Sequence, residues 1–528
     1  MRRRALLAVG ATAVFSAPLL GEMLGFPERT LARSHLPKQP GEHDASVVLP
    51  GDPRFGAVTR GFNQRWIADP AYVRLCSGSA DVVEAVESAV RAGLRITVRS
   101  GGHCYENFAY VNTGGVIVDL SLMNGVYVDA QTGWLVVDAG ATLWDVYVQM
   151  YKQHGVTLPG GSCYSVGAGG HITGGGYGLL SRLHGLTIDY LSAVEVVHVD
   201  GSGHVRCERF NGKVLGSAES LMLWGSQGGG GGNFGIVTKF FFADAPAAPS
   251  QVCLASESWS WSDFTVDSFT EFLQSYGQFF VDHKNPGDVF SGLFTLLHLT
   301  CAPMPSIGLT IQSVGDDPGL IHAFRDAVRP ADVRPEPLFI PVGYHGIPAP
   351  TLDVQVTPWL FATQIFNSSG SPQRGKYKSA YMIGNFTDDE CRAIWHYLRE
   401  SRFKNSQALL QIDSYGGQVN AVSTEQTAIP QRSSAMKLQY QTYWIHRDDD
   451  EVNLRWIRDF YSAMYGADGP VPDGRLDGCY VNYPDVDLSN WQTLYYKENY
   501  TKLQQVKKKW DPLNIFNHAQ SIELPPII

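Results

Sequence analysis

The chain has 528 residues, more than one ordinary hydrophobic core needs and enough for two lobes that each bury a core. Its 41 basic and 51 acidic residues give a net charge of −10, which provides no overall attraction for phosphodiester backbones, so no nucleic-acid partner is expected. The eight cysteines form no CxxC pair and show no regular spacing, so we predict no metal site, while disulfide pairing and oligomeric state stay open.

The first 40 residues are typical of an export signal followed by a linker. Met1-Arg2-Arg3-Arg4 forms a charged n-region, and a largely apolar stretch of signal-peptide length continues to Leu20. The paired arginines indicate a twin-arginine signal, although the usual Ser and Phe positions of that pattern are not met. We therefore predict an exported protein with no membrane anchor in its mature form. The alternative is an uncleaved anchor, for which the apolar run is short.

Helix and strand signals are mixed from residue 45 to 245, which predicts the α+β class. Ser79 can cap a helix that Gly93 stops, and the strand-like run Arg95–Val98 follows. Thr142 and Asp145 have capping-box spacing and predict a helix that continues to Tyr151. Further strands are predicted at Val116–Leu120, Trp134–Ala139 and Ala193–Val199, and a run of five glycines at 228–232 leads into a strand that ends near Phe242.

Two nucleophilic side chains in this region are flanked by glycines. His103 follows Arg99-Ser100-Gly101-Gly102, and Cys163 lies in the glycine-rich segment 160–171. Consecutive glycines permit positive φ and let successive backbone N–H groups converge on one anion, as a pyrophosphate requires. Neither segment is a Walker or a GxGxxG motif. Together they predict two close-approach loops that hold one dinucleotide from both sides.

The composition changes near residue 246 to aromatic and polar strand segments with proline-rich connections, which predicts a second domain up to about residue 475. Period-2 alternation places Gln411, Asp413 and Tyr415 on one face of a strand over 409–415. A second strand over 437–444 presents Gln439 and Gln441, with Tyr443, on one face. Two such strands would form a hydrogen-bonding floor for a hydroxylated substrate, although the strands alone are equally compatible with a sheet face wetted by solvent.

The C-terminal segment 476–528 again carries dense motifs, namely Asn482-Tyr483-Pro484-Asp485 and Asp511-Pro512-x-Asn514-x-Phe516. We expect this segment to return to the first domain. Between the two motifs, Lys507-Lys508-Lys509 is interpreted as a solvated helix face, because the apolar positions of that stretch face elsewhere.

These motifs together resemble the FAD-linked oxidases of the berberine-bridge-enzyme-like branch, within the vanillyl-alcohol-oxidase and p-cresol-methylhydroxylase (PCMH) superfamily. The resemblance spans Gly51 to Ile522 and looks closest to bacterial members that oxidise sugars, including sugars on antibiotics. It implies a PCMH-type FAD-binding domain of two α/β subdomains over 45–245. It also implies a substrate domain over 246–475, with an antiparallel sheet covered by helices, and a C-terminal segment over 476–528.

The resemblance implies an FAD joined through an 8α bond to His103 and a 6-S bond to Cys163. Taken alone, His103 would be a hydrogen-bonded loop histidine and Cys163 a buried small hydrophobe. The remaining residues expected at the cofactor are Arg99, Ser100, Gly101, Gly102, Gly169, Gly170, Gly174, Val237 and Asn482.

The resemblance also implies an oxidation chemistry. Tyr483 matches the tyrosine that acts as base in carbohydrate-oxidising relatives, and Asp413 is the neighbour expected to act on its proton, since an unperturbed tyrosine has a pKa of about 10. Tyr415 is the fallback for Asp413. Tyr177 is expected among the catalytic groups, and the residues expected to bind substrate are Tyr105, Gln411, Gln439 and Gln441.

One departure from the plant alkaloid enzymes narrows the chemistry. Those enzymes carry a catalytic glutamate shortly after a Tyr-Gly-Gly run, whereas here Tyr415-Gly416-Gly417 is followed by Gln418-Val419-Asn420-Ala421. This favours oxidation of an alcohol or hemiacetal of a sugar or glycosylated natural product, with O2 as acceptor and H2O2 as product. One alternative is that the same scaffold oxidises or desaturates a non-sugar polyketide or alkaloid-type substrate. Another is an idle flavin- or carbohydrate-binding protein, against which the joint presence of His103, Cys163 and Tyr483 argues.

Overall fold

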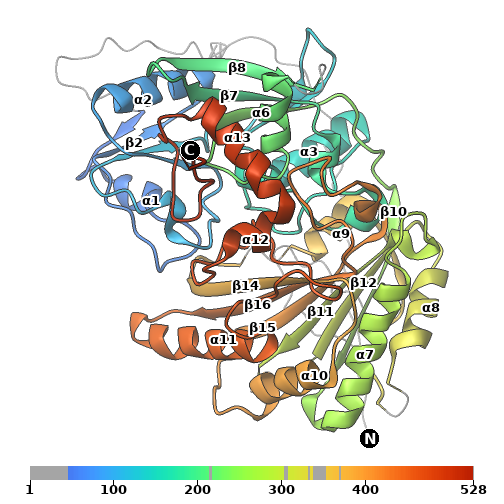
Figure 1. Ribbon diagram of the computed structural model, residues 1–528. Coiled ribbons are helices and arrows are strands. Elements are labelled where there is room, and N and C mark those ends of the chain that lie inside the picture. Colours follow the sequence, from blue (N-terminus) through green and yellow to red (C-terminus); the bar gives the residue numbers. More distant parts are fainter. Residues whose placement is uncertain are drawn as a thin grey trace, which may run out of the picture. The chain divides into compact units, whose positions relative to one another are not determined.

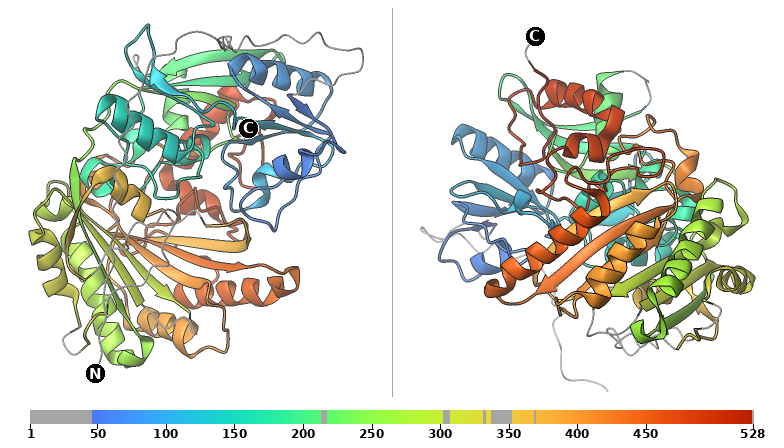
Figure 2. Two further views of the ribbon diagram at one scale, coloured as in Figure 1. Left: turned by 180° about the vertical axis from the view of Figure 1, so that it is seen from behind. Right: turned by 60° about the horizontal axis from the view of Figure 1, so that its bottom comes forward.

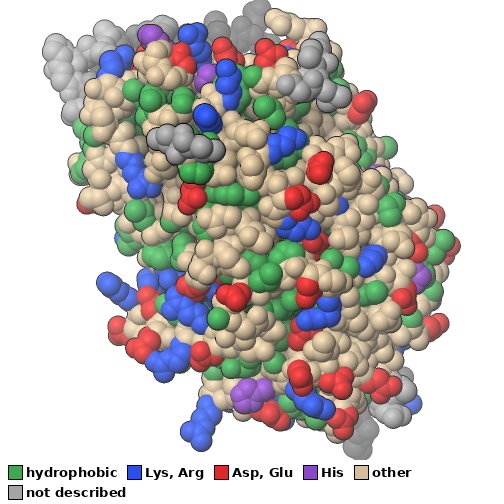
Figure 3. Space-filling view, viewed as in Figure 1, with side chains coloured by type: hydrophobic (Ala, Val, Ile, Leu, Met, Phe, Trp, Pro, Cys, Tyr) green, Lys and Arg blue, Asp and Glu red, His purple; other side chains and the backbone are tan. Residues whose placement is uncertain are grey.

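The computed structural model describes residues 46–212, 217–301, 307–330, 333–336, 352–367 and 370–526, all within one unit that spans Ala45–Ile528. The predicted export signal and linker at 1–40 lie outside the described residues. Within the described ranges, no helix is both long enough and apolar enough to cross a membrane. Acidic and basic side chains are interspersed over the face of the molecule shown in Figure 3.

A small, mostly parallel sheet begins the fold (Figure 1). Its strands are, in spatial order, β1 (Val47–Val48), β2 (Tyr72–Leu75), β4 (Val116–Asp119) and β3 (Ile96–Arg99). Because β2 and β3 both run parallel to β4, they need a crossover connection, and helix α2 (Ser79–Arg91) supplies it. The predicted helix–strand pair is therefore present. The predicted cap is corrected: Gly78 occupies the cap position, and Ser79, the first residue of α2, donates its hydroxyl to Glu195 instead.

A second small sheet is antiparallel. Its strands are, in spatial order, β5 (Val126–Val128), β6 (Leu135–Asp138), β9 (Ile236–Phe242), β7 (Ala193–Val199) and β8 (Val205–Asn211). The helices of this part of the chain besides α2 are α1 (Phe55–Val58), α3 (Leu143–His154), α4 (Ala168–Thr173), α5 (Ser181–His184) and α6 (Ala218–Ser226). The predicted capping box opens α3: Thr142 Oγ1 accepts the Asp145 N–H at 3.2 Å, and Asp145 Oδ2 accepts the Thr142 N–H at 2.9 Å.

The third sheet is the largest and is antiparallel at every pairing. Its seven strands are, in spatial order, β13 (Gln355–Pro358), β10 (Gln251–Trp259), β12 (Ile307–Val314), β11 (Leu293–Thr300), β15 (Ala408–Ser414), β16 (Met436–Trp444) and β14 (Arg374–Met382). One face of this sheet carries the helices α7 (Val266–Asp282), α8 (Gly319–Val328), α10 (Asp388–Trp395) and α11 (Asp450–Tyr465), as Figures 1 and 2 show. Since side chains alternate along each strand, the opposite face is available to line a site. Helix α9 (Trp359–Ile365) follows β13.

The C-terminal helices α12 (Trp491–Tyr496) and α13 (Tyr500–Trp510) return to the small sheets, where α13 packs on α6 (Figure 1). The solvated-face interpretation holds for Lys508 and Lys509 but is wrong for Lys507, which is fully buried. Its ammonium donates to the backbone oxygen of Asn233 at 2.8 Å and to Asp511 Oδ2 at 2.6 Å. A buried cation needs such partners, and here they join the C-terminal motif to the glycine-rich loop before β9. The α+β prediction is confirmed by these three sheets and their helices.

Candidate active site

A cavity of about 660 Å³ lies where the small sheets, the large sheet and the C-terminal segment meet. This volume is in the range of small-molecule and cofactor sites. One side, which we call the glycine wall, is formed by the loops at 100–103, 161–170 and 230–235. The opposite side, the polar floor, is the face of the large sheet that carries residues 294–298 of β11, 409–413 of β15 and 437–443 of β16. Most of the predicted site residues line this one cavity.

The loops of the glycine wall approach each other more closely than side chains would allow. A Cβ on Gly101 would overlap the backbone nitrogen of Gly167 and lie 2.8 Å from its Cα. A Cβ on Gly178 would overlap the carbonyl of Gly160. Gly102 has a φ of +75°, a backbone conformation that residues with a side chain rarely adopt. The glycines therefore bring the His103 loop and the Cys163 loop into direct backbone contact.

His103 and Cys163 both line the cavity, and a hydrogen bond links their loops. His103 Nε2 lies 2.8 Å from the hydroxyl of Ser165, two residues beyond Cys163, and the ring stacks on Phe62 at 4.8 Å. Burial, together with the Arg99 guanidinium, lowers the pKa of His103 to about 4. The imidazole is consequently neutral at physiological pH and retains a lone pair that can form a covalent bond.

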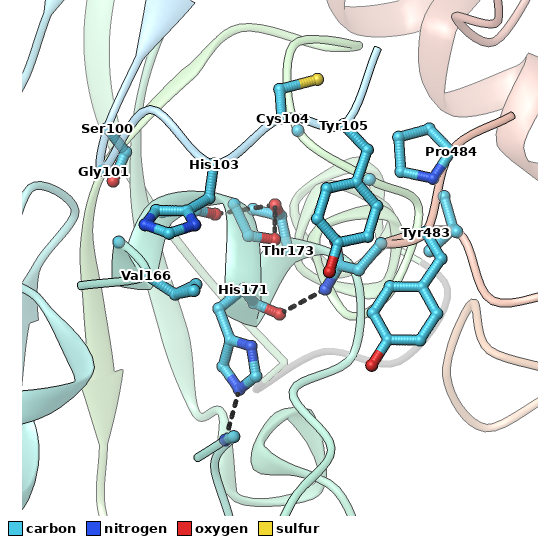
Figure 4. Close-up of a pocket in the computed structure, with 18 of the residues that line it drawn as sticks. Ser100, Gly101, His103, Cys104, Tyr105, Val166, His171, Thr173, Tyr483 and Pro484 are labelled. Carbon is cyan, nitrogen blue, oxygen red and sulfur yellow. Dashed lines mark hydrogen bonds between the residues drawn. The ribbon is translucent and has the colours of Figure 1, made fainter. Parts of the chain in front are cut away.

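The Cys163 loop is held by neutral hydrogen bonds. Tyr164 N–H donates to Asn367 Oδ1 at 3.1 Å, and the Tyr164 hydroxyl lies 2.7 Å from that of Thr363 on α9. On the other side, the Gly161 N–H donates to His171 Nε2 at 3.1 Å (Figure 4). Burial lowers the pKa of His171 to about 4, so this nitrogen stays an acceptor. His171 thus supports the glycine wall from beneath.

The other expected cofactor residues lie as follows. Arg99, Ser100, Gly169, Gly170, Val237 and Asn482 line the cavity together with Gly101 and Gly102. Gly174 does not: its Cα packs against Asn482, whose amide is fixed by donation to the His171 carbonyl at 2.9 Å. Gly174 therefore acts on the site through Asn482.

The wall also fits an anionic group. Arg99 lines the cavity and is ion-paired to Asp119, yet within the described residues its Nε has no hydrogen-bond partner. Arg99 Nε lies beside the Gly101-Gly102 turn. A buried guanidinium donor without a partner is costly, so it favours an anion at this position. The residues present therefore fit the pyrophosphate of a dinucleotide.

The polar floor is set by the register of three antiparallel strands. Asp413 lies opposite Lys437 across β15 and β16, and Gln411 lies opposite Gln439. On the other side of β15, Gln411 lies opposite His298 of β11. Directly opposite residues share a face, so polar groups from all three strands gather beneath the cavity.

Three residues at the end of the floor form a buried acid–base group. The Lys437 ammonium pairs with Asp413 Oδ2 at 2.7 Å and donates to the Tyr483 hydroxyl oxygen at 2.9 Å. Lys437 is 1% exposed and Asp413 2% exposed. Burial, together with the negative charge of Asp413, raises the pKa of Tyr483 well above its usual value of 10. The ammonium acts in the opposite direction, because its hydrogen bond favours the phenolate.

The remaining floor residues form a continuous hydrogen-bond network. Gln411 Nε2 donates to Asp413 Oδ1 at 2.7 Å, while its Oε1 faces His298 Nε2 at 3.0 Å. Gln441 Nε2 donates to the same Oε1 at 3.3 Å, and the Tyr443 hydroxyl donates to Gln441 Oε1 at 2.7 Å. These contacts fix the orientation of each amide, so the groups that face the cavity are preorganised.

The tyrosines expected at the site have different positions. Tyr105 and Tyr483 lie side by side (Figure 4), with ring centroids 5.5 Å apart. Gln439 Nε2 donates to the Tyr105 hydroxyl at 3.0 Å. Tyr177 lines the cavity with its ring 4.4 Å from the Lys437 ammonium, and its hydroxyl donates to the Ser414 carbonyl.

The prediction for Tyr415 is wrong: this residue does not lie on the face that carries Gln411 and Asp413. The strand β15 ends at Ser414, so alternation stops there, and the Tyr415 hydroxyl donates to the Gln431 carbonyl at 3.2 Å, away from the cavity lining. Its fallback role as partner of Tyr483 therefore has no geometric support.

Two residues of the polar floor, Lys437 and His298, were not predicted from the sequence. Lys437 has the same parity as Gln439, Gln441 and Tyr443, so the period-2 argument that selected those residues also places Lys437 on the floor. His298 had no such signal, because only the pairing of β11 with β15 brings it opposite Gln411.

Comparisons with known proteins identify relatives over most of the chain. The family described as "FAD binding domain" matches residues 70–206, and the family described as "Berberine and berberine like" matches residues 479–523. A hexose oxidase from Chondrus crispus is 37% identical, over 89% of this chain and 93% of the relative. An aclacinomycin-N/aclacinomycin-A oxidase from Streptomyces galilaeus is 36% identical, over 89% and 88%. The crystal structure of the glycopeptide hexose oxidase DBV29 complexed with teicoplanin superposes with a TM-score of 0.82 at 32% identity, covering 90% of this chain and 98% of that one.

The fold, the glycine wall and these similarities define an FAD-linked oxidoreductase, with FAD as its cofactor. More narrowly, the chain belongs to the berberine-bridge-enzyme-like family of FAD-linked oxidases.

Proposed function

We propose that this enzyme oxidises an alcohol or hemiacetal group of a sugar or glycosylated natural product, with O2 as final acceptor and H2O2 as product. The relatives named as hexose oxidase and aclacinomycin oxidase support this substrate class. The observation that carries the proposal is the composition of one cavity. Two nucleophiles, His103 and Cys163, line its glycine wall, and a phenol in contact with an ammonium lies at its floor.

We further propose that the flavin is bound covalently through both nucleophiles. The 2.8 Å contact between His103 and Ser165 brings the two loops together on the same wall, and the Arg99 guanidinium is available for the pyrophosphate. Residues 45–245 and 476–528 would then hold the cofactor and residues 246–475 the substrate. Segment 1–40 would serve as the export signal, probed by N-terminal sequencing of the secreted protein.

When bound, FAD supplies the acceptor for the hydride of the substrate carbon. The protein supplies the proton acceptor: Tyr483, as phenolate, takes the proton of the substrate hydroxyl. Lys437 stabilises this phenolate through its hydrogen bond, and Asp413 compensates the charge of the buried ammonium. The amides of Gln411, Gln439 and Gln441 bind neighbouring hydroxyls, since an amide both donates and accepts. Because burial raises the pKa of Tyr483, activity should increase toward alkaline pH.

Acid precipitation tests the covalent bonds. The wild-type pellet should be yellow, each of His103→Ala and Cys163→Ala should keep the colour through the other bond, and the double variant should lose it. A colourless wild-type pellet, with no flavin mass on either peptide, would refute covalent attachment.

Turnover tests the chemistry. Tyr483→Phe should keep the flavin while kcat falls about 10²- to 10⁴-fold, the usual size of a general-base contribution. Peroxide release should be measured with free sugars, glycosylated natural products and the matching aglycones. Activity on aglycones alone would contradict the sugar assignment and favour a non-sugar substrate on the same scaffold.

A further inference from the structure

Five charged side chains form an interior cluster outside the cavity lining, where the edge strand β14 meets two loops. Its members are Lys376, Lys378, Glu106, Asp485 and Asp487. The first four have side chains at most 4% exposed. Charges at this depth are costly unless paired, and none of these groups takes part in the proton transfer proposed above. The cluster therefore calls for an explanation of its own.

Lys376 contacts carboxylates from both loops. Its ammonium donates to Glu106 Oε1 at 2.5 Å and to Asp485 Oδ1 at 2.6 Å. Glu106 follows His103 by three residues, and Asp485 follows Tyr483 by two. A single ammonium thus connects the loop that carries a flavin-binding nucleophile to the loop that carries the proposed base.

The next residue of β14 holds the same loop from another side. Tyr377 takes the opposite face of the strand and stacks on Tyr105, with ring centroids 3.6 Å apart and planes 13° apart. Tyr105 and Glu106 are consecutive, so two adjacent residues of the His103 loop are fixed by two adjacent residues of one strand. This double contact determines both the position and the rotation of the loop.

The two lysines are not equivalent. Lys378 donates to Asp485 Oδ2 at 2.6 Å and lies 3.1 Å from Asp487, which is also paired with Arg458. Asp485 would keep Lys378 as a partner if Lys376 were removed. Glu106 would keep no cation in contact, and in the described part of the chain its Oε2 already has no hydrogen-bond partner.

We propose that Lys376 is a positioning residue that holds the His103 loop against the Tyr483 loop and thereby permits the bond between His103 and the flavin. The inference rests on the proposed two-point flavin attachment. It predicts that loss of the Lys376 charge weakens attachment at His103 selectively and leaves attachment at Cys163 intact, because the Cys163 loop is held by Asn367 and Thr363 instead.

The test measures the flavin-bound fraction of the His103 peptide and of the Cys163 peptide by mass spectrometry, together with kcat and KM. Lys376→Met should lower the His103 fraction about tenfold or more, since a displacement of about 1 Å can cost a reaction 10²-fold. Its kcat should fall more than its KM rises. Lys376→Arg should restore most of the His103 fraction, and Lys378→Met should leave it near wild type. Arg374→Met is the matched control, because Arg374 is on the same face of β14 but pairs with Asp450.

An unchanged His103 fraction in folded Lys376→Met would overturn the proposal, and so would an equal fall at both peptides, which indicates general destabilisation. If Lys376→Met does not fold, Glu106→Gln decides: a selective fall at His103 supports the proposal and no change overturns it. Absence of bound flavin on both wild-type peptides would instead refute the proposed two-point attachment itself.

Discussion

The two sides of the cavity are built in opposite ways. The glycine wall presents mainly backbone, and its shape depends on side chains being absent where Gly101 meets Gly167 and Gly178 meets Gly160. The polar floor presents side chains, and its shape depends on hydrogen bonds between strands that are far apart in the sequence. A wall of backbone can approach a cofactor closely, while a floor of side chains can move a proton. The wall therefore serves cofactor binding and the floor serves proton transfer. Substitutions in the wall should change flavin binding, and substitutions in the floor should change turnover.

The largest effect is expected from Lys437→Met on the floor. Without the ammonium, Tyr483 loses the hydrogen bond that favours its phenolate and remains beside the negative charge of Asp413. We expect kcat to fall about 10²- to 10⁴-fold, as for loss of the base itself, and the rise of kcat with pH to move to higher pH.

Flavin content should not change in this variant, because Lys437 belongs to the floor. Lys502→Met, which removes a lysine that stacks on Trp224 away from the cavity, is the control. A Lys437→Met enzyme with wild-type kcat and pH profile would show that the phenol acts without the ammonium.

The second effect concerns His171 of the glycine wall and the pH dependence of the free energy of unfolding. The pKa of His171 is lowered to about 4, below its unfolded value near 6.5, so the folded state binds fewer protons between these values. The contribution of His171 to the free energy of unfolding is therefore fully present above about pH 6.5. It is lost as the pH falls toward 4, and the loss is at most about 3 kcal/mol.

His171→Gln keeps an acceptor for the Gly161 N–H but cannot titrate. Its unfolding free energy, measured by urea denaturation from pH 4 to 7, should fall less steeply, by up to about 1.4 kcal/mol per pH unit. His204→Gln, at an exposed position, should follow the wild-type curve. Parallel curves for His171→Gln and wild type would contradict the buried neutral imidazole.

The same contrast explains what the sequence could and could not predict. The glycine wall could be predicted from local motifs around His103 and Cys163, because a close backbone approach requires glycines at neighbouring positions in the sequence. Strand alternation selected Gln411, Asp413 and Gln441, which do line the cavity. The polar floor could be predicted only in part, because His298 joins it only through the pairing of β11 with β15.

Two residues were placed wrongly from the sequence, for different reasons. Tyr415 has the parity of Asp413, but β15 ends one residue earlier, and alternation carries no information beyond the end of a strand. Lys507 was assigned to solvent from its charged neighbours, whereas its burial depends on Asn233 and Asp511, which only the tertiary fold brings together. The role of Lys376 could not be predicted at all, since its partners Glu106 and Asp485 are separated from it by more than a hundred residues.

The third effect tests the close approach in the wall. Gly101→Ala places a methyl group against the backbone of Gly167, which cannot move without opening the wall. Overpacking of this kind costs about 1–3 kcal/mol, so flavin retention by protein that lacks the covalent bonds should weaken about ten- to hundredfold. Flavin retention is measured as the flavin absorbance per mole of protein in the His103→Ala/Cys163→Ala background. Gly56→Ala, on α1 outside the cavity lining and with open space around its Cα, should bind as that background does, and equal losses in both variants would disprove the close-approach argument.

The smallest effect is expected at the outer part of the floor. Gln441 accepts from the Tyr443 hydroxyl and donates to Gln411, so Gln441→Met removes substrate-facing polarity while leaving Tyr483 and Lys437 in place. One neutral hydrogen bond contributes about 0.5–1.5 kcal/mol, which predicts a KM for the sugar substrate about two- to tenfold higher, with kcat within about twofold of wild type. Flavin content should be unchanged, and Gln505→Met on the exposed side of α13 should match wild type in both constants. A fall in kcat without a rise in KM would place Gln441 with the proton-transfer group, because binding and chemistry would then share the same residues along the floor.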